Sequence, residues 1–464
     1  MARGLASLVL ASSLVGALAL VAPEASAAPI ELVEQREQFM LFDDVDGSVE
    51  NANWFMRDPF LAGYQAVEEG FLLEHPDDSQ FLVVYTTWTL PAGIGAFFQS
   101  MANDVEGIGF EHIANEDPII PAPYFDDTPN SQVQGFLNMN RWTQYLGDDE
   151  GGLDDARISL VFGQELGHAW ASFVYYNQGM GWETNLLGRA NAHWSFYMQT
   201  GGSPLQGHEW VDNGDGTFTA IPQDVFLFSD LDLYLMGLLP PEDVAPWFIL
   251  ENPYNCVDSA SKSGDCAPEG AFLFEADTYT INATRRDVSI GDVISAEGLR
   301  SPAYPDTPDE FDVSFLFIKR PDEELSETEL ASIDAVIERS IELFEVQTRG
   351  LGHVINRTAA ETPPGGDTGG EEGSGDGGVD DTGGQGAEDG TGGEDSPSGA
   401  SDSAATGATE GNGTGGSDGA GQDGDGGGCA CTTHSQPGSG LPLWAGALVL
   451  LSWRRRRGAT SAAR

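Results

Sequence analysis

Residues 155–176 constrain the fold of this chain more than any other segment, because their apolar side chains recur at spacings of three and four. Those side chains are Ile158, Phe162, Leu166, Ala169 and Phe173. This period predicts an α-helix with one buried face. The same helix carries Gln164, Glu165 and His168, so any chemistry of these polar groups takes place beside a packed core.

The segments around this helix predict a mixed fold. Residues 80–87, 133–140 and 312–319 are rich in apolar and β-branched side chains, which is typical of buried strands. Residues 94–105 predict a short helix. This succession of strands and helices indicates an α+β architecture, in which two strands precede the helix over 155–176.

Local signals mark the ends of further elements. Ser229 with Asp232, and Ser326 with Glu329, have the capping-box spacing that starts a helix. Residues 212–219 contain an Asn-Gly and an Asp-Gly pair, which predict a hairpin turn. The same run lacks the full pattern of an EF-hand calcium loop.

The composition divides the chain into four parts, of which the last is a tail over 429–464. Residues 1–27 have the basic start, apolar stretch and small-residue end of a secretion signal. Residues 28–357 hold nearly all the aromatic side chains, enough for one large domain or two closely packed ones. Residues 358–428 consist mainly of Gly, Asp, Ser, Thr and Glu, so we expect a disordered acidic linker that cannot offset its ordering entropy.

The tail begins with Cys429 and Cys431. Its apolar stretch, 441–453, would span only about 20 Å as a helix, whereas a bilayer core is about 30 Å thick. A run of arginines follows at 454–457. This arrangement resembles the MYXO-CTERM sorting domain of myxobacterial proteins. The resemblance implies cleavage near one of the two cysteines and attachment to the cell surface or outer membrane; a plain membrane anchor is the alternative.

The chain is strongly acidic, with 20 Lys and Arg against 74 Asp and Glu and a formal net charge of −54. Nucleic acid is excluded as a partner, because neutralising phosphates requires Lys and Arg. A carboxylate-rich surface that stays hydrated in salty surroundings accounts for the excess. Calcium binding by some of these carboxylates is an alternative.

Two cysteines of the body, Cys256 and Cys266, flank a polar loop. Disulfides form and persist in exported proteins. The short separation of this pair therefore predicts a local disulfide.

Glu165 and His168 have the spacing of the second half of the zinc-binding helix motif His-Glu-x-x-His. Side chains four apart lie about 5–6 Å from each other at Cβ on one helix face, so two imidazoles at that spacing can reach one ion. Here Gln164 stands in the position of the first histidine. Because an amide oxygen is a poorer zinc ligand than imidazole, we expect a weakened affinity for zinc.

The third ligand of such a site has to come from farther along the chain. His193 is the first choice, because it lies between small residues and Trp194, where its ring could be held away from water. A structural role for this ring beside Trp194 fits equally well. Asp232 and His208 are alternative ligands.

Residues 75–355 resemble secreted bacterial zincin-like domains of the metzincin kind. The resemblance lies in the Gln-Glu-Leu-Gly-His run at 164–168, the His-Trp-Ser run at 193–195 and the Leu-Asp-Leu-Tyr-Leu-Met-Gly run at 231–237. It implies a zincin-like fold and a zinc ion, with Glu165 as the catalytic base that activates water. The ligands would then be His168, His193 and, weakly, Gln164. The chain departs from the family motif at its first histidine, where it has Gln164.

Two functions follow from these patterns. The first is a monomeric, surface-anchored zinc metalloendopeptidase that hydrolyses a protein or peptide substrate. The second is a catalytically impaired pseudopeptidase that serves as a surface binding or adhesion module. The amphipathic helix that carries residues 164–168, with the two strands before it, favours the first function. The identity of Gln164 favours the second.

Overall fold

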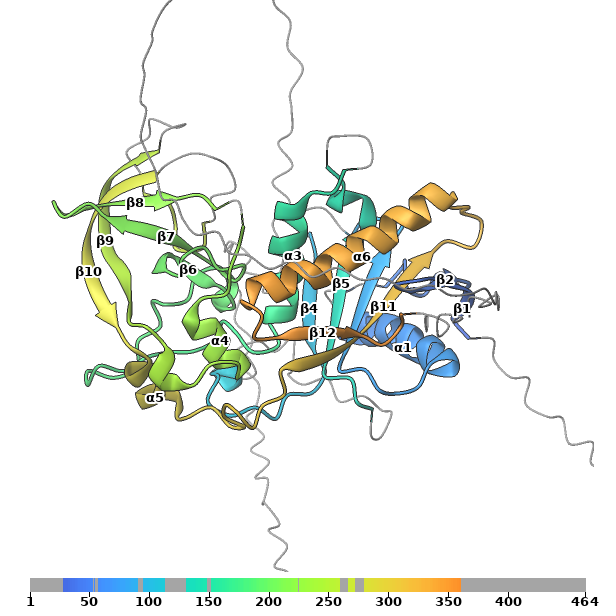
Figure 1. Cartoon of the computed structure of the whole chain (residues 1–464), viewed down its shortest axis with the longest axis horizontal. Helices are drawn as coiled ribbons and strands as arrows, with labels where there is room; N and C mark the ends of the chain where they lie inside the picture. The colour runs from blue at the N-terminus through green and yellow to red at the C-terminus, as the bar shows by residue number, and fades with distance from the viewer. Residues whose placement is uncertain are drawn as a thin grey trace, which may run out of the picture.

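Two β-sheets organise the chain, one open and one closed into a barrel (Figure 1). The structure is a computed structural model. It describes residues 28–52, 54, 57–90, 95–112, 131–147, 152–223, 225–258, 266–271 and 279–359. We call the open sheet with its helices the sheet lobe, and the barrel with its helices the barrel lobe.

The open sheet has seven strands in the order β1-β2-β11-β3-β5-β4, with β12 pairing beside β11. The strands are β1 Ile30–Gln35, β2 Met40–Asp44, β3 Phe81–Thr86, β4 Phe97–Ser100, β5 Gly135–Arg141, β11 Glu310–Lys319 and β12 His353–Asn356. Strand β11 is parallel to β2, β3 and β12, and β3 is parallel to β5. The pairs β1–β2 and β4–β5 are antiparallel.

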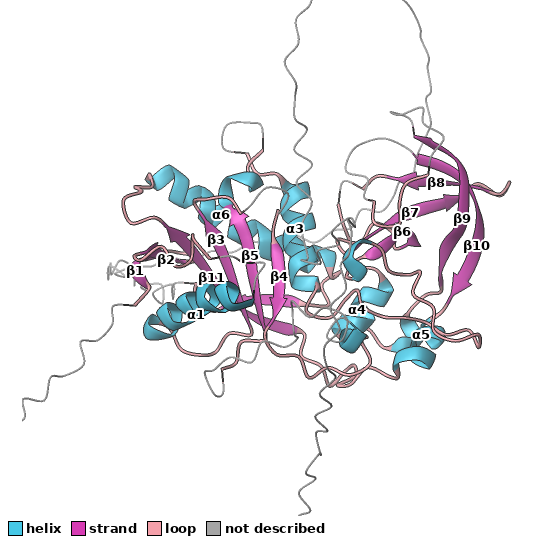
Figure 2. Ribbon diagram, turned by 180° about the vertical axis from the view of Figure 1, so that it is seen from behind, coloured by secondary structure: helices cyan, strands magenta, loops and turns pink. Residues whose placement is uncertain are grey.

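Helices cover both faces of this sheet (Figure 2). Helix α1, Arg57–Glu74, packs on one face against Leu82 and Leu316. Helices α3, Asp155–Gly167, and α6, Glu327–Gln347, pack on the other face. Side chains of adjacent residues in a strand point to opposite faces, so the nearly continuous apolar runs of β3 and β11 fill both cores.

The barrel is closed by five strands in the order β10-β8-β7-β6-β9. They are β6 Trp194–Gln199, β7 Gln206–Asp212, β8 Thr217–Ile221, β9 Trp247–Asp258 and β10 Tyr279–Val288. Helices α4, Asp230–Met236, and α5, Ile290–Glu297, lie at one end of it (Figure 1). Three single turns of 3-10 helix complete the described elements: Trp142–Tyr145, Arg189–Asn191 and Pro241–Asp243. One apolar core runs through both lobes, from the sheet to the barrel interior.

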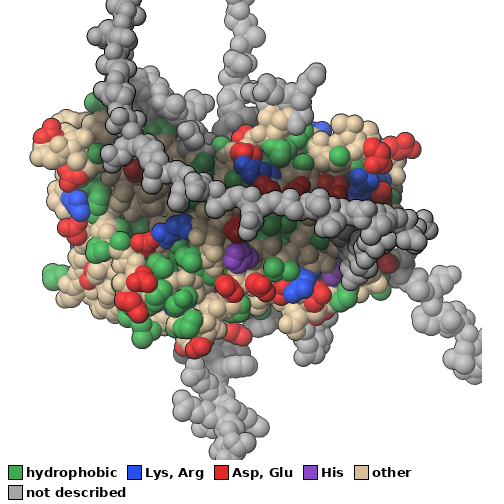
Figure 3. Space-filling view, viewed as in Figure 1, with side chains coloured by type: hydrophobic (Ala, Val, Ile, Leu, Met, Phe, Trp, Pro, Cys, Tyr) green, Lys and Arg blue, Asp and Glu red, His purple; other side chains and the backbone are tan. Residues whose placement is uncertain are grey.

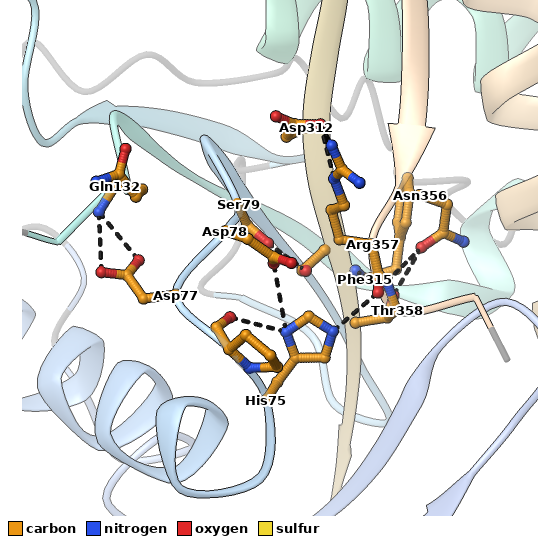
Figure 4. A network of polar contacts seen from close by, with 12 residues as sticks. His75, Asp77, Asp78, Ser79, Gln132, Asp312, Phe315, Asn356, Arg357 and Thr358 are labelled. Atoms are coloured by element: carbon orange, nitrogen blue, oxygen red, sulfur yellow. Dashed lines mark hydrogen bonds and ion pairs between the residues drawn. The ribbon is translucent and has the colours of Figure 1, made fainter. Parts of the chain in front are cut away.

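The C-terminal end of the described chain is fastened to the sheet lobe (Figure 4). His75, just after α1, has its Nε2 2.8 Å from the carbonyl oxygen of Arg357. The Arg357 Nε donates to Asp312 at 2.7 Å, and the Phe315 amide donates to the Thr358 hydroxyl at 2.9 Å. Residues up to 358 therefore belong to the folded body.

Several expectations from the sequence are confirmed. Mixed helix and sheet content is present, and strands occupy most of 80–87, 133–140 and 312–319. Capping boxes begin α4 and α6. The β7–β8 hairpin turns within 212–219, and Cys256 and Cys266 form a disulfide.

Two local expectations are wrong. Residues 97–100 form strand β4 rather than part of a helix, because they pair antiparallel with β5. Helix α3 ends at Gly167 rather than continuing to 176. There Ala169 and Trp170 donate backbone hydrogen bonds three residues back, to Leu166 and Gly167, a tightening typical of a helix end.

The secretion signal over 1–27, most of the linker and the tail with Cys429 and Cys431 lie outside the described residues. Among the helices that the structure does describe, none combines the length and the apolar character needed to cross a bilayer.

Candidate functional site

Helix α3 brings the Gln164–His168 run to the junction of the two lobes. Asp154 caps the helix by accepting a hydrogen bond from the Arg157 amide at 3.0 Å. Phe162 packs between Phe315 of the sheet and Phe344 of α6, with ring centroids 6.0 and 6.1 Å away. The helix is thus fixed on both sides, and its last turn presents the polar run to the core.

His168 is the C-cap residue of α3 and is almost fully buried. Its Nδ1 lies 3.0 Å from the Ala171 carbonyl oxygen, so the ring donates from Nδ1 and keeps a lone pair on Nε2. This Nε2 is buried and has no hydrogen-bond partner within the described part of the chain. Such an atom is a potential acceptor or ligand.

The ring of His193 lies beside that of His168, with centroids 4.8 Å apart and planes at 85°. His193 directly precedes β6 and is completely buried. The structure thus brings together the two imidazoles that the sequence analysis singled out.

Arg189 engages both nitrogens of His193. Its carbonyl oxygen lies 2.8 Å from His193 Nδ1, and its Nη2 lies 2.8 Å from His193 Nε2. The guanidinium can only donate. Therefore His193 is the neutral tautomer with its proton on Nδ1, and its Nε2 lone pair accepts from Arg189.

Gln206, the first residue of β7, holds the guanidinium from another side. With its side-chain oxygen turned to Arg189, it accepts from Nε at 3.3 Å and from Nη2 at 2.7 Å. Gln206 is buried. Arg189 is therefore fixed by an imidazole and an amide that both lie in the interior.

Gln164 and Glu165 are also buried, and Glu165 has no exposed surface. The Gln164 Nε2 donates to the Glu165 carboxylate at 3.2 Å. The amide that replaces the first motif histidine is thus engaged with the neighbouring carboxylate.

Burial keeps both rings of the pair uncharged. It lowers the pKa of His168 to about 3, and the nearby positive charge of Arg189 contributes in the same direction. Burial also lowers the pKa of His193 well below its usual range, again with a contribution from Arg189. At neutral pH the cation of this cluster is the guanidinium.

Asp232, one of the alternative ligands, is held by hydrogen bonds that cap α4. Its Oδ1 accepts from Trp194 Nε1 at 2.7 Å. Its Oδ2 accepts from the Ser203 hydroxyl at 2.8 Å and from the Ser229 amide and hydroxyl at 2.7 Å. Burial raises the pKa of Asp232, and these hydrogen bonds oppose the rise. The carboxylate therefore ties β6, the loop before β7 and α4 together.

His208 and Met236 belong to the apolar interior. His208 lies on β7 with its Nδ1 3.2 Å from the Phe196 carbonyl oxygen and its ring 4.5 Å from that of Phe196. Met236 is the last residue of α4, a core position. The carbonyl groups of Leu235 and Met236 accept from the Arg300 guanidinium, so Arg300 closes the end of this helix.

The residues around His168 do not fit a zinc ion as they are placed. A catalytic zinc site has three protein ligands and one open position. In the described residues, the only cluster of three His, Cys, Asp or Glu ligand atoms within 4.8 Å of one another is elsewhere, at Glu111, His112 and Glu297. Around His168 there are two imidazoles, one of them already bonded to Arg189, and the Gln164 amide. We therefore derive no zinc-dependent step.

Neither Arg189 nor Gln206 was predicted from the sequence as part of this cluster. Arg189 precedes His193 by four residues in a chain with few basic side chains, and that proximity was the available signal. Gln206 offered none, because only the pairing of β6 with β7 brings it close.

No model of a protein family, no curated protein and no solved structure matches this chain.

Proposed function

We propose that this protein is an exported, surface-displayed binding module with a metallopeptidase-like site that does not hydrolyse peptides. The observation that supports this proposal is the hydrogen bond from Arg189 Nη2 to His193 Nε2, 2.8 Å long. His193 Nε2 is the atom whose lone pair would bind a metal. The Arg189 guanidinium of the same chain donates a hydrogen bond to that lone pair instead.

The charge of Arg189 argues in the same direction. A metal ion bonded to His193 Nε2 would lie within a few ångströms of a permanent positive charge. Repulsion between unit charges about 4 Å apart amounts to about 4 kcal/mol at an effective dielectric constant of about 20. Arginine cannot relieve that repulsion by losing a proton. Here the guanidinium supplies the positive charge that zinc supplies in a peptidase.

The surface beside this cluster suits a basic protein or peptide as the partner. A hollow of about 470 Å³ is lined by residues that include Ser195, Tyr197, Glu251 and Glu269. Acidic side chains are spread over the face drawn in Figure 3, beside few Lys and Arg. A field of one sign attracts partners of opposite charge and makes the binding sensitive to salt.

The test is hydrolysis of unfolded protein substrates by the full chain with zinc supplied. Glu165→Gln is the matched control, because it removes the carboxylate at the position of the catalytic base in the motif. We expect no hydrolysis above background from either protein. A lysine-rich peptide should bind both equally and bind Glu269→Gln more weakly. Hydrolysis by the wild type that Glu165→Gln abolishes would overturn the proposal.

A further inference from the structure

A second cluster of metal-binding side chains lies at the junction of the lobes, outside the cluster of His168 and His193. Glu111 and His112 follow strand β4 in the sheet lobe, and Glu297 is the last residue of α5 in the barrel lobe. Their ligand atoms all lie within 4.8 Å of one another. Residues far apart in the sequence thus converge on one point.

The distances suit a small divalent ion. His112 Nε2 lies 3.0 Å from Glu297 Oε1 and 2.9 Å from Oε2. Ligand atoms around a tetrahedral ion with bonds of about 2.0–2.1 Å are about 3.3 Å apart. The His112–Glu297 pair needs to open by only a few tenths of an ångström to admit such an ion.

Surrounding groups fix the orientation of two of these ligands. The His112 ring stacks on Tyr175, with centroids 3.9 Å apart and planes at 5°, and meets the edge of Trp182 at 5.9 Å. The Tyr175 amide donates to Glu297 Oε1 at 2.6 Å. Partners of this kind orient metal ligands and raise the affinity of a site.

The charges favour a cation here. The Glu297 side chain is 2% exposed, and a carboxylate oxygen of Glu111 lies within 4.8 Å of its ligand atom. Two carboxylates therefore face one imidazole in a partly buried place. In addition, Glu297 ends a helix, where the backbone dipole attracts positive charge.

We propose that Glu111, His112 and Glu297 form a structural site for a divalent transition-metal ion of the zinc type. An imidazole with carboxylates suits such ions, whereas calcium prefers a larger set of oxygen ligands. The ion would reinforce a junction that already pairs Glu106 with Ser301 through two backbone hydrogen bonds, of 2.9 and 3.0 Å. This site is independent of the function proposed above.

The test is titration of the metal-stripped full chain with zinc, in physiological salt and excess magnesium to suppress loose binding by surface carboxylates. We expect one tight equivalent and a rise in Tm on binding. Glu111→Gln and His112→Gln should each lower the affinity at least about tenfold. His353→Gln is the matched control, because His353 lies 3.7 Å from Glu345 with an exposed ring; this change should leave the affinity as it is.

Cobalt(II) provides a second readout that does not depend on the stability of a variant. Its binding should quench the fluorescence of Trp182, whose ring lies near that of His112, and Trp182→Phe should remove that part of the quenching. Zinc that leaves Tm unchanged in the folded wild type would overturn the proposal. So would binding of equal affinity in wild type, Glu111→Gln and His112→Gln.

Discussion

Arg189 bonds to both nitrogens of His193, through its carbonyl oxygen at Nδ1 and its guanidinium at Nε2, each over 2.8 Å. One residue thus fixes the tautomer of the imidazole through its backbone and its side chain, and its guanidinium donates to the Nε2 lone pair. The neighbouring His168 ring, 4.8 Å away between centroids, keeps a buried Nε2 with no partner in the described residues. The cluster is therefore asymmetric, with one imidazole satisfied and one not.

Replacing Arg189 should destabilise the fold. Arg189→Met keeps the length of the side chain but leaves His193 Nε2 and the buried Gln206 oxygen without a donor. Each orphaned buried group costs about 1–3 kcal/mol, so we expect a loss of about 2–4 kcal/mol in urea unfolding. Arg157→Met is the control, because Arg157 makes one long surface ion pair, 3.9 Å to Asp154; it should change stability by less than about 0.5–1 kcal/mol. Equal effects of the two changes would contradict the assigned role of Arg189.

The close approach of α3 and α6 can be tested at Gly163. Alanine normally stabilises a helix relative to glycine by about 1 kcal/mol. A Cβ at Gly163 would lie 2.4 Å from Gln347 Oε1, and the Gln347 amide donates to the Ser159 carbonyl at 2.8 Å. Gly163→Ala should therefore destabilise by about 1–3 kcal/mol. Gly291→Ala in α5 is the matched control, since its Cβ would meet only Ser289 Oγ, at 3.6 Å. This substitution should stabilise the fold or leave its stability unchanged. If both substitutions changed the free energy of unfolding in the same direction, the packing of α3 against α6 described above would be contradicted.

Buried His208 should make stability depend on pH. Burial lowers its pKa to about 4 from an ordinary 6.5, so the unfolded chain takes up a proton first as the pH falls. Stability is then full above about pH 6.5, falls between about 6.5 and 4, and levels off below; the loss is about 3 kcal/mol. His208→Asn should reduce this loss, measured by urea unfolding at several pH values. An unchanged pH dependence in the variant would show that His208 is not buried in its neutral form.

Asp232 should matter for stability rather than for chemistry. Asp232→Asn turns an amide toward groups that now donate to a carboxylate, namely Trp194 Nε1 and the Ser203 and Ser229 hydroxyls. Hydrogen bonds to a charged group contribute about 1.5–3 kcal/mol, so we expect a loss of at least about 2 kcal/mol in thermal or urea unfolding. Asp243→Asn, at an exposed position after α4, is the control and should be neutral. A neutral Asp232→Asn would argue against the network.

Features that rest on short-range hydrogen bonds could be predicted from the sequence. The capping boxes at Ser229 and Ser326 are examples, because both partners lie within three residues of each other. The juxtaposition of His168 with His193 was also expected, from a motif resemblance. The zincin-like fold stays a prediction, since only mixed helix and sheet content is shown.

Features that rest on distant pairing could not be predicted. The segment 97–100 forms a strand only because β5 lies beside it. The apolar spacing continues past Gly167, but Phe173 packs against Phe110 from outside the helix. Similarly, the barrel closes through β6 and β9, and Gln206 meets Arg189 only once β6 and β7 have paired.

The most direct measurement of the central claim is zinc binding in a His112→Gln background, where the junction site is removed. We expect this protein to take up no zinc that depends on His168. Adding Gln164→His and Arg189→Met should create one equivalent of binding, which His168→Gln then removes. Zinc bound by the His112→Gln protein alone, lost on His168→Gln and accompanied by hydrolysis that needs Glu165, would contradict the account.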